Sequence, residues 1–441
     1  MRILHVVHQY PPDYIGGVEL HTQALARVLA ERGHQVSVFY RRSAEGAGLE
    51  RRQEGDVTVW AAWSGLVKPT GRFLASFRDE PILDAFRHVL EEAAPGLVHI
   101  QHLMGLPLAL VDLLRQKNVP FVLTLHDYWW LCANAQLLTN DSEELCEGPE
   151  LWINCGRCAL ARAGRDNVLW LAPTIAPIFA YRNSRLHRIA ELAAHVIVPT
   201  TFTRETYQPL NLPSHKLTVI PHGIAVPSVT TFNLEGDASA PAVSGRRSSV
   251  VGRPPFRIAY VGGLARQKGV HVLIEAVNHL PREGVSLTLY GDEAAFPEYV
   301  AELKALVSHP RIHFAGRIPN EQLLQALTDV DVLVVPSIWY ETAALVIQEA
   351  FAAGVPVIAS NLGALRERVR HGEDGLLVPP GDPAALRKAL LELLQDPTLR
   401  ARLRNGIRPF RTIEQQVDDI EVIYHQVLQE PSSVPAAPPL P

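Results

Sequence analysis

Two glutamates enclose an apolar stretch in the second half of the chain. Glu341 and Glu349 flank residues 342–348, and residues 350–353 are also apolar. If a helix begins directly after Glu341, the two carboxylates lie about two turns apart along its axis and reach different parts of one elongated ligand. Such a separation does not suit an acid/base pair acting at a single bond. Glu349, inside an apolar helix, requires a partner, either a ligand hydroxyl or a nearby cation.

Glycines and cations mark two loops that suit a phosphate group. Residues 260–269 have the sequence Tyr-Val-Gly-Gly-Leu-Ala-Arg-Gln-Lys-Gly, so Arg266 and Lys268 lie between a predicted strand and a helix start. This order predicts a pyrophosphate cradle, the alternative being two solvated cations. Gly16 and Gly17 precede the first predicted helix, where they either let the backbone approach an anion or form a tight turn. The absence of a G-x-G-x-x-G run disfavours a nicotinamide dinucleotide.

A histidine and an aspartate end a predicted strand in the first half of the chain. His126 and Asp127 follow the strand 121–125, at the sheet edge where ligands of α/β domains bind. The aromatic residues 128–130 come next and either stack on a ring or sugar or fill the core beside a capping aspartate. The sequence leaves these two interpretations open.

The pair Asp329 and Asp331 has the spacing of a metal-binding D-x-D motif. Here the apolar strand 331–336 begins at the pair instead of leading to it. We therefore favour a helix end and a strand start, and expect chemistry that needs no divalent cation.

All four cysteines fall in one loop-rich segment, residues 132–158. The spacing Cys155-x-x-Cys158 is typical of half a zinc site, and a cytoplasmic setting disfavours disulfides. Cys132 and Cys146 precede it at irregular spacing. We expect the four thiolates to bind one structural zinc ion, the alternatives being two disulfides or four independent thiols.

The composition is that of a globular protein of two or three domains. The chain has 441 residues, 47% hydrophobic and 20% charged, with a net charge of −5. This balance excludes disorder, collagen and coiled coil as the main class, and the slight acidic surplus argues against nucleic-acid binding. No apolar run reaches the roughly 18–20 residues of a membrane span, and the N-terminus resembles a strand more than a signal peptide. We expect a cytoplasmic protein.

Alternating strand and helix patterns predict two doubly wound, Rossmann-like α/β domains that face each other across a cleft. The strands expected in the first are 2–8, 36–40, 97–100, 119–125, 195–200 and 217–221. Those expected in the second are 256–261, 285–290, 311–315, 331–336, 355–359 and 375–378. The domains then cover 1–222 and 256–411, with a flexible linker at 223–255, a helix at 412–430 and a disordered tail at 431–441.

The chain resembles the family 4 glycosyltransferases. The resemblance rests on the glycine pair 16–17, on Gly-Gly-x4-Lys-Gly at 262–269, and on the block 336–378, which contains E-x7-E and Gly-x-Pro-Val-Ile-Ala-Ser. It covers nearly the whole chain outside the linker and the tail. Residues 126–132, His-Asp-Tyr-Trp-Trp-Leu-Cys, are similar to a bacterial subgroup that often acts in cell-surface polysaccharide synthesis.

The resemblance implies the GT-B architecture, a retaining sugar transfer, and roles for single residues. The residue matching Glu349 holds the nucleotide ribose, the one matching Glu341 contacts sugar hydroxyls, and the one matching His126 lies beside the reacting sugar. The residue matching Lys268 neutralises the diphosphate, and the amides at 16–17 approach the phosphates or the acceptor. The last helix is expected to return to the first domain.

Three positions depart from the family pattern. Gly263 stands where the family usually has an arginine, and Ala344 and Ala364 stand where glycine is common. With that arginine missing, Lys268, with Arg266 as a substitute cation, is left to contact the phosphates.

Together these observations predict a metal-independent, retaining glycosyltransferase of the hexosyltransferase type. It would move a sugar from a nucleotide-diphosphate sugar to a glycan or lipid-linked acceptor. The aromatics Trp60, Trp63 and 170–181 indicate an apolar acceptor or a peripheral contact with the inner face of the membrane, unless they belong to the core. The alternatives are a nucleotide-sugar epimerase on the same scaffold and a non-catalytic protein that binds sugars or nucleotide-sugars.

Overall fold

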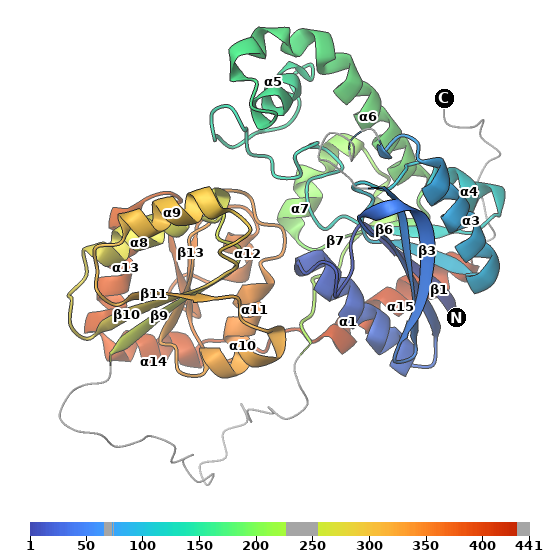
Figure 1. Cartoon of the computed structure of the whole chain (residues 1–441). Coiled ribbons are helices and arrows are strands. Elements are labelled where there is room, and N and C mark those ends of the chain that lie inside the picture. Colours follow the sequence, from blue (N-terminus) through green and yellow to red (C-terminus); the bar gives the residue numbers. More distant parts are fainter. Residues whose placement is uncertain (66–72, 74, 226–254, 430–441) are drawn as a thin grey trace. The chain divides into compact units, whose positions relative to one another are not determined.

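The computed structural model describes residues 1–65, 73, 75–225 and 255–429. These residues form two compact units (Figure 1). Unit 1 comprises Met1–Gly223 with Trp339–Leu345 and the C-terminal segment from Ile413, and unit 2 comprises Ile224–Ile338 and Val346–Thr412. Most of the expected linker, 223–255, and the whole expected tail, 431–441, lie outside the described residues.

Unit 1 is built on an eight-stranded sheet in the order β3-β4-β2-β1-β5-β6-β7-β8. Its central strands are short, fully buried apolar runs, as parallel strands covered on both faces require. The strands are β1 Arg2–Val7, β2 Gln35–Arg41, β3 Ala44–Glu54, β4 Val57–Gly65, β5 Leu97–Ile100, β6 Phe121–Thr124, β7 His195–Val198 and β8 Leu217–Val219.

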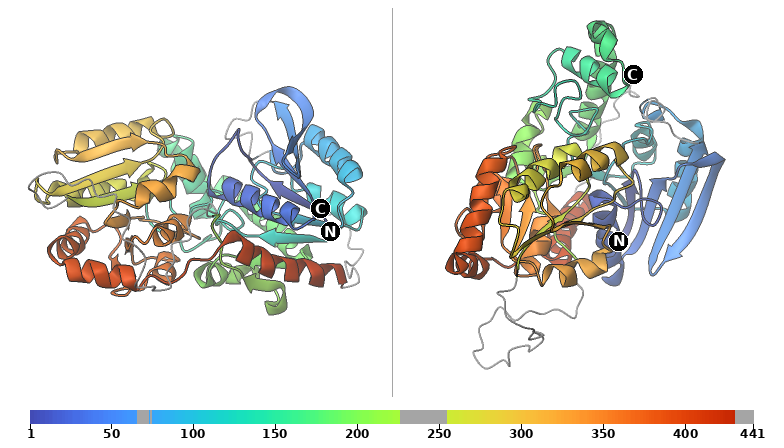
Figure 2. Two further views of the ribbon diagram at one scale, coloured as in Figure 1. Left: turned by 90° about the horizontal axis from the view of Figure 1, so that it is seen from below. Right: turned by 60° about the vertical axis from the view of Figure 1, so that its left-hand side comes forward.

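The hairpin of β3 and β4 was not predicted from the sequence. Strand β3 pairs antiparallel with β4 and forms the edge of an otherwise parallel sheet, in blue in Figure 2. Its side chains are mostly exposed and charged, so it lacks the apolar alternation of a strand. The signal that was available is the turn at Gly55-Asp56, where Gly55 has a φ of 58°.

Helices cover both faces of this sheet. They are α1 Gly17–Glu31, α3 Glu80–Ala93, α4 Leu110–Gln116, α6 Ala172–Leu192, α7 Thr201–Thr206 and α15 Ile413–Gln429. Helix α5 Ile153–Arg162 packs on α6 and lies away from the sheet (Figure 1). Helix α15 lies beside α1 (Figure 1) and buries one face, including Val417, Ile420 and Tyr424, in the same core as Leu25 and Leu29 of α1. The last helix therefore belongs to unit 1.

Unit 2 has a six-stranded, fully parallel sheet in the order β11-β10-β9-β12-β13-β14. Its strands are β9 Phe256–Val261, β10 Val285–Tyr290, β11 Ile312–Gly316, β12 Val332–Val335, β13 Val357–Ser360 and β14 Gly375–Val378. The helices are α8 Val270–Asn278, α9 Pro297–Leu306, α10 Asn320–Leu327, α11 Leu345–Ala352, α12 Leu365–Arg368, α13 Pro383–Gln395 and α14 Pro397–Asn405.

The predicted fold class, two doubly wound α/β domains, is confirmed. The strand order reverses between β1 and β5 in unit 1 and between β9 and β12 in unit 2. The carboxyl ends of strands at such reversals are where α/β sheets bind ligands. Among the described residues, no helix combines the length and apolar character needed to cross a membrane.

Candidate active site

The reversal point of unit 1 gathers the loop glycines, His8 and a carboxylate. Gly16 is the N-cap of α1 in extended conformation and Gly17 is its first residue. A Cβ atom on Gly16 would lie 2.5 Å from Glu19 Oε2, so a larger residue there would displace this carboxylate. Glu19 Oε1 pairs with His8 Nε2 at 3.2 Å, and burial raises the pKa of Glu19. Gly16 thus lies against this carboxylate, whereas a Cβ atom on Gly17 would meet nothing within 4 Å.

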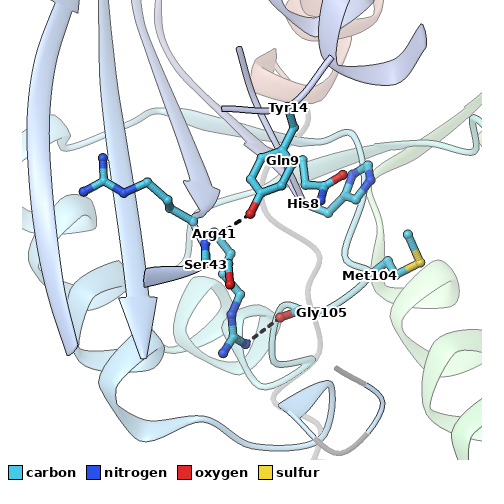
Figure 3. A pocket seen from close by; sticks show the side chains of 8 residues that line it. His8, Gln9, Tyr14, Arg41, Ser43, Met104 and Gly105 are labelled. Carbon is cyan, nitrogen blue, oxygen red and sulfur yellow. Dashed lines mark hydrogen bonds between the residues drawn. The ribbon is translucent and has the colours of Figure 1, made fainter. Parts of the chain in front are cut away.

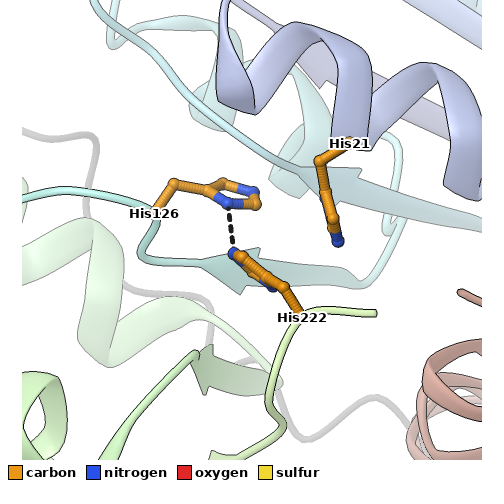
Figure 4. Close-up of side chains that lie close together, drawn as sticks. All are labelled: His21, His126 and His222. Atoms are coloured by element: carbon orange, nitrogen blue, oxygen red, sulfur yellow. Dashed lines mark hydrogen bonds between the residues drawn. The ribbon is translucent and has the colours of Figure 1, made fainter. Parts of the chain in front are cut away.

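His126 lies in a buried cluster of three histidines (Figure 4). Its Nδ1 is 3.0 Å from His222 Nε2, and its Nε2 is 2.7 Å from Gln101 Oε1. His21 of α1 completes the cluster, and the ligand atoms of the three rings lie within 4.8 Å of one another. Burial, reinforced by the neighbouring His222, holds the pKa of His126 well below its usual value. His126 is therefore neutral with both ring nitrogens hydrogen-bonded, which does not suit a general base.

The residues after His126 belong to the core. Asp127 caps the turn by accepting a hydrogen bond from Trp129 N at 2.9 Å, and both its oxygens lie 3.1 Å from His102 Nε2. Tyr128, Trp129 and Trp130 are all at most 3% exposed. The interpretation in which these aromatics stack on a ligand is therefore wrong, because their rings fill the core between β6 and α6.

A pocket that was not predicted opens at the carboxyl ends of β1 and β2 (Figure 3). It is lined by His8, Gln9, Tyr14, Arg41, Arg42, Ser43, Met104 and Gly105. Arg41 is held rigidly, because its guanidinium donates to Gly105 O and Ser64 Oγ, both at 2.7 Å, and pairs with Asp79 at 2.9 Å. The sequence signal was weak, since these residues come from separate loops.

At the point where the strand order of unit 2 reverses, Gly269 packs against the backbone of Pro336. Gly269, with a φ of 68°, is the N-cap of α8, and a Cβ atom there would collide with Pro336 O after β12. The loop between β9 and α8 is closed further by a hydrogen bond of 2.7 Å from the Tyr260 hydroxyl to Gly263 O. The glycine-rich loop is therefore packed directly onto the end of β12.

The two predicted phosphate cations differ in their surroundings. Arg266 donates to Glu302 on α9 at 2.6 Å and lies over the Tyr299 ring. Both partners of this ion pair are largely exposed, so it contributes little stability and breaks readily. Lys268 is half-buried directly before Gly269 and the start of α8.

The helix that follows Glu341 begins later than the sequence suggested. Helix α11 starts only at Leu345, and Ala344 before it has a φ of 45°. This left-handed conformation explains why glycine suits position 344, since alanine adopts it at a cost of roughly 1 kcal/mol. Glu341 is 7% exposed, and its Oε1 accepts from Trp339 Nε1 at 2.9 Å. Its segment belongs to unit 1, where the Tyr340 ring packs on Phe202.

Glu349 lies in the second turn of α11, in unit 2. Its carboxyl group makes no hydrogen bond or ion pair with any described residue, so the nearby cation allowed by the sequence is absent from the described part of the chain. Burial raises its pKa to about 7, with no compensating charge. A half-buried carboxyl without a partner on a mostly apolar helix is costly unless a ligand meets it.

The D-x-D pair has a structural role. Asp331 Oδ2 accepts from Arg257 N at 2.9 Å, and Asp329 Oδ1 pairs with the Arg257 guanidinium at 3.1 Å. Arg400 lies 3.5 Å from the other oxygen of Asp331. The arginines thus occupy these carboxylates, and the pair joins α10 to β12 as the sequence favoured.

The four cysteines are reduced and half-buried. Cys155 and Cys158 lie in α5, and burial, followed by the other thiols, raises their pKa values to about 12 and about 11. Amide groups of Asn140 and Asn154 lie 3.2 and 3.8 Å from the sulfurs of Cys158 and Cys146. Among the described residues, only the three histidines form a group of metal ligands within 4.8 Å of one another.

The aromatics that suggested a surface contact divide into two groups. Trp60 is 5% exposed and lies in the core, whereas Trp63 is covered by the Arg42 guanidinium at 4.4 Å from its ring. Trp170, Ile178 and Tyr181, on and before α6, are 74%, 46% and 47% exposed.

Comparison with known proteins gives matches over both units. Residues 15–226 match the family model described as Glycosyltransferase Family 4, and residues 255–396 match that described as Glycosyl transferases group 1. The chain is 28% identical over 417 residues to a glycogen synthase of Mycobacterium tuberculosis, covering 92% of this chain and 89% of that one.

Solved structures of similar fold cover almost the whole chain. A sucrose-phosphate synthase from Thermosynechococcus elongatus superposes with a TM-score of 0.64 and 22% identity over 96% of this chain and 98% of that chain. The Anabaena protein HepE, solved with UDP and glucose, has a TM-score of 0.64 and 17% identity over 96% and 99%. At these identities the likeness shows the shared fold alone.

Proposed function

The chain belongs to the family 4 glycosyltransferases and has their GT-B fold, and from this premise we propose a retaining transfer of a sugar from a nucleotide-diphosphate sugar to a glycan or lipid-linked acceptor. The observation that carries the donor assignment is the carboxyl of Glu349, which has no partner among the described residues. A ribose offers two adjacent hydroxyl donors, which a carboxylate accepts as charge-assisted hydrogen bonds. The complex of the related HepE with UDP and glucose supports a nucleotide-sugar as the donor class.

Lys268 is the proposed counter-ion of the donor diphosphate. It directly precedes the N-terminus of α8, so its ammonium group and the helix amides would add their positive potentials. Arg266 joins it by exchanging Glu302 for a phosphate, and the amides of Gly16 and Gly17 are proposed to approach a phosphate or the acceptor. These groups stabilise the charge that develops on the leaving diphosphate.

Glu341 and His126 are the proposed contacts to the transferred sugar. Trp339 already orients the Glu341 carboxylate, which then accepts from sugar hydroxyls. Since His126 is neutral and fully hydrogen-bonded, we assign it no proton abstraction. A donor phosphate oxygen takes the acceptor proton on the face where the glycosidic bond breaks, so the configuration is retained without an enzymic nucleophile.

The acceptor is assigned to unit 1. The pocket at the ends of β1 and β2 offers a fixed arginine, Arg41, with hydroxyl and amide groups from Tyr14, Ser43 and Gln9. The exposed apolar side chains on and before α6 support a lipid-linked acceptor and a peripheral membrane contact, in keeping with cell-surface polysaccharide synthesis.

Transfer assays test this function. A thermal-shift panel of nucleotide-sugars first identifies the donor, because a ligand at 100 times its Kd stabilises by about 2.7 kcal/mol. With that donor, nucleotide release is expected only when a sugar acceptor is present. The transfer rate measured just after adding excess chelator should remain within about threefold of the rate of the magnesium control. NMR of the product should show the same anomeric configuration as that of the donor sugar.

Four outcomes would contradict parts of the proposal. Donor conversion without acceptor would indicate an epimerase, and tight donor binding without turnover on any acceptor a binding protein. A transfer rate that collapses with chelator and returns with magnesium, or a product of inverted anomeric configuration, would contradict the proposed mechanism. Neither result would affect the fold.

We also propose that Cys132, Cys146, Cys155 and Cys158 bind one structural zinc ion, which needs their sulfurs drawn together to about 2.3 Å from the metal. Zinc would displace the thiol protons that burial retains, and the Asn140 and Asn154 amides already point at two of the sulfurs. Protein purified without added zinc is expected to contain about one equivalent. Cys155→Ser should lose it, whereas His21→Ala should keep it. Four freely titrating thiols and no metal would contradict the site.

A further inference from the structure

The histidine cluster of unit 1 is part of a longer chain of buried hydrogen bonds. His21, His126 and His222 are at most 5% exposed, as are Gln101, Gln416 and His5, which continue the chain. The rings of His21 and His222 lie 4.1 Å apart, and those of His126 and His222 lie 4.8 Å apart (Figure 4). These residues come from β1, α1, α15 and the loops after β5, β6 and β8.

One backbone amide determines the direction of this chain. Gly223 N donates to Gln416 Oε1 at 2.8 Å, and a backbone N–H can only donate, so the orientation of the Gln416 amide is known. The Gln416 nitrogen, 3.2 Å from His222 Nδ1, must therefore be the donor there. A proton on His222 Nδ1 is excluded, and His222 carries its proton on Nε2.

The same reasoning assigns the next residues. His222 Nε2 donates to His126 Nδ1 at 3.0 Å, which leaves the His126 proton on Nε2. His126 Nε2 then donates to Gln101 Oε1 at 2.7 Å, and Gln101 Nε2 donates to His5 Nδ1 at 3.1 Å. The series of hydrogen bonds thus runs from Gln416 to His5 on β1. The orientation of Gln416 determines which nitrogen carries the proton in His222 and in His126.

This ordering argues against a metal ion between the three rings. A metal would need the lone pair of His222 Nε2, which holds the proton donated to His126. Binding would require the Gln416 amide to turn over and to lose its bonds from Gly223 N and His21 Nε2, the latter 2.8 Å long. The hydrogen bonds account for the His126–His222 contact without an ion.

We propose that His222, oriented by Gln416, is a positioning residue that keeps His126 neutral with its proton on Nε2. The inference rests on the proposed function, in which His126 lies beside the transferred sugar. A sugar hydroxyl that replaces Gln101 as the partner of Nε2 then meets a hydrogen-bond donor. A neutral ring also avoids placing a second positive charge beside the cationic sugar of the transition state.

Two substitutions of His222 test the positioning role. In His222→Gln, the side-chain amide still accepts from Gln416 and donates to His126, so kcat should stay within about threefold of the wild type. In His222→Leu, both bonds are lost, and kcat should fall 10- to 100-fold while the Kd of the donor nucleotide changes less than about twofold. Equal kcat values for the two variants would overturn the proposal.

The proton positions are read directly from 15N chemical shifts of labelled histidine. In the wild type, Nδ1 of both His126 and His222 should be unprotonated. Gln416→Glu puts an acceptor opposite His222 Nδ1, so this nitrogen should become protonated and kcat should fall at least tenfold. Gln415→Glu, the same change on the exposed neighbour, should alter neither shift nor kcat.

A wild-type His126 protonated on Nδ1, or a His222 shift that Gln416→Glu leaves unchanged, would overturn the inference. So would a stoichiometric metal that His21→Ala removes. These shifts do not depend on turnover. If the wild-type protein transfers no sugar but shows the expected shifts, the proposed function fails and the proton order stands.

Discussion

Glu349→Gln is expected to lower donor affinity at least 100-fold and to leave the fold intact. The glutamine would replace two charge-assisted hydrogen bonds to ribose hydroxyls, each contributing about 1.5–3 kcal/mol. The donor-free protein should be as stable as the wild type or more stable, because the half-buried Glu349 carboxyl has no partner among the described residues. Calorimetric titration with the donor nucleotide and thermal unfolding without it measure the two effects.

The raised pKa of Glu349 adds a pH signature to this experiment. Its value of about 7 means that, below pH 7, ionising the carboxyl for ribose binding costs about tenfold in affinity per pH unit. Donor affinity of the wild type should therefore rise about tenfold between pH 6 and pH 8. It should stay flat over that range in Glu349→Gln.

The control is Glu321→Gln, the same change on an exposed glutamate at the start of α10. It should leave both the affinity and its pH dependence unchanged. If Glu349→Gln binds the donor with the same affinity as the wild type, Glu349 does not belong to the donor site.

Acid is expected to unfold unit 1 well above the pH at which most globular domains lose stability. Burial lowers the pKa of His5 to about 3 and that of His21 to about 4, and it holds those of His99 and His126 well below 6.5. In the unfolded chain these four rings take up protons near pH 6.5. At pH values between the lowered pKa values of the folded state and 6.5, the unfolded state binds more protons than the folded state. The free energy of unfolding therefore falls as the pH falls.

The expected size of this effect approaches the whole stability of a domain. Glu19, whose pKa burial raises, gains a proton on folding in part of this window and opposes the four histidines by at most one proton. Three net protons correspond to roughly 4 kcal/mol per pH unit once the unfolded rings are fully protonated. Because those rings are only half protonated at pH 6.5, the loss between pH 6.5 and pH 5 is about 5 kcal/mol. Typical domains have only about 5–15 kcal/mol in total.

Urea unfolding followed by circular dichroism at pH 7.5, 6.5, 5.5 and 5.0 measures this slope. His5→Gln should reduce it by about one proton, whereas His313→Gln, on the exposed side of β11, should not change it. A slope no steeper than one proton over this range would show that the buried rings are protonated in the folded state.

Most elements of both sheets, and most of the chemistry assigned to unit 2, could be predicted from the sequence. Strands β9, β10 and β14 begin and end at the predicted residues, because buried parallel strands are short apolar runs bounded by polar or turn residues. Glu349 was identified because a carboxylate within an apolar helix is conspicuous in any sequence. The β3–β4 hairpin escaped because an exposed, charged edge strand has no apolar period.

The surroundings of His126 could not be predicted from the sequence. The parallel register of β1 and β5 places His5 opposite His99, and the docking of α15 beside α1 brings Gln416 to His21 and His222. Nothing in the spacing of polar residues along the chain indicates these partners, because they come from six separate elements and loops. Burial then makes each of these hydrogen bonds obligatory, so the proton positions follow from long-range packing and not from local sequence.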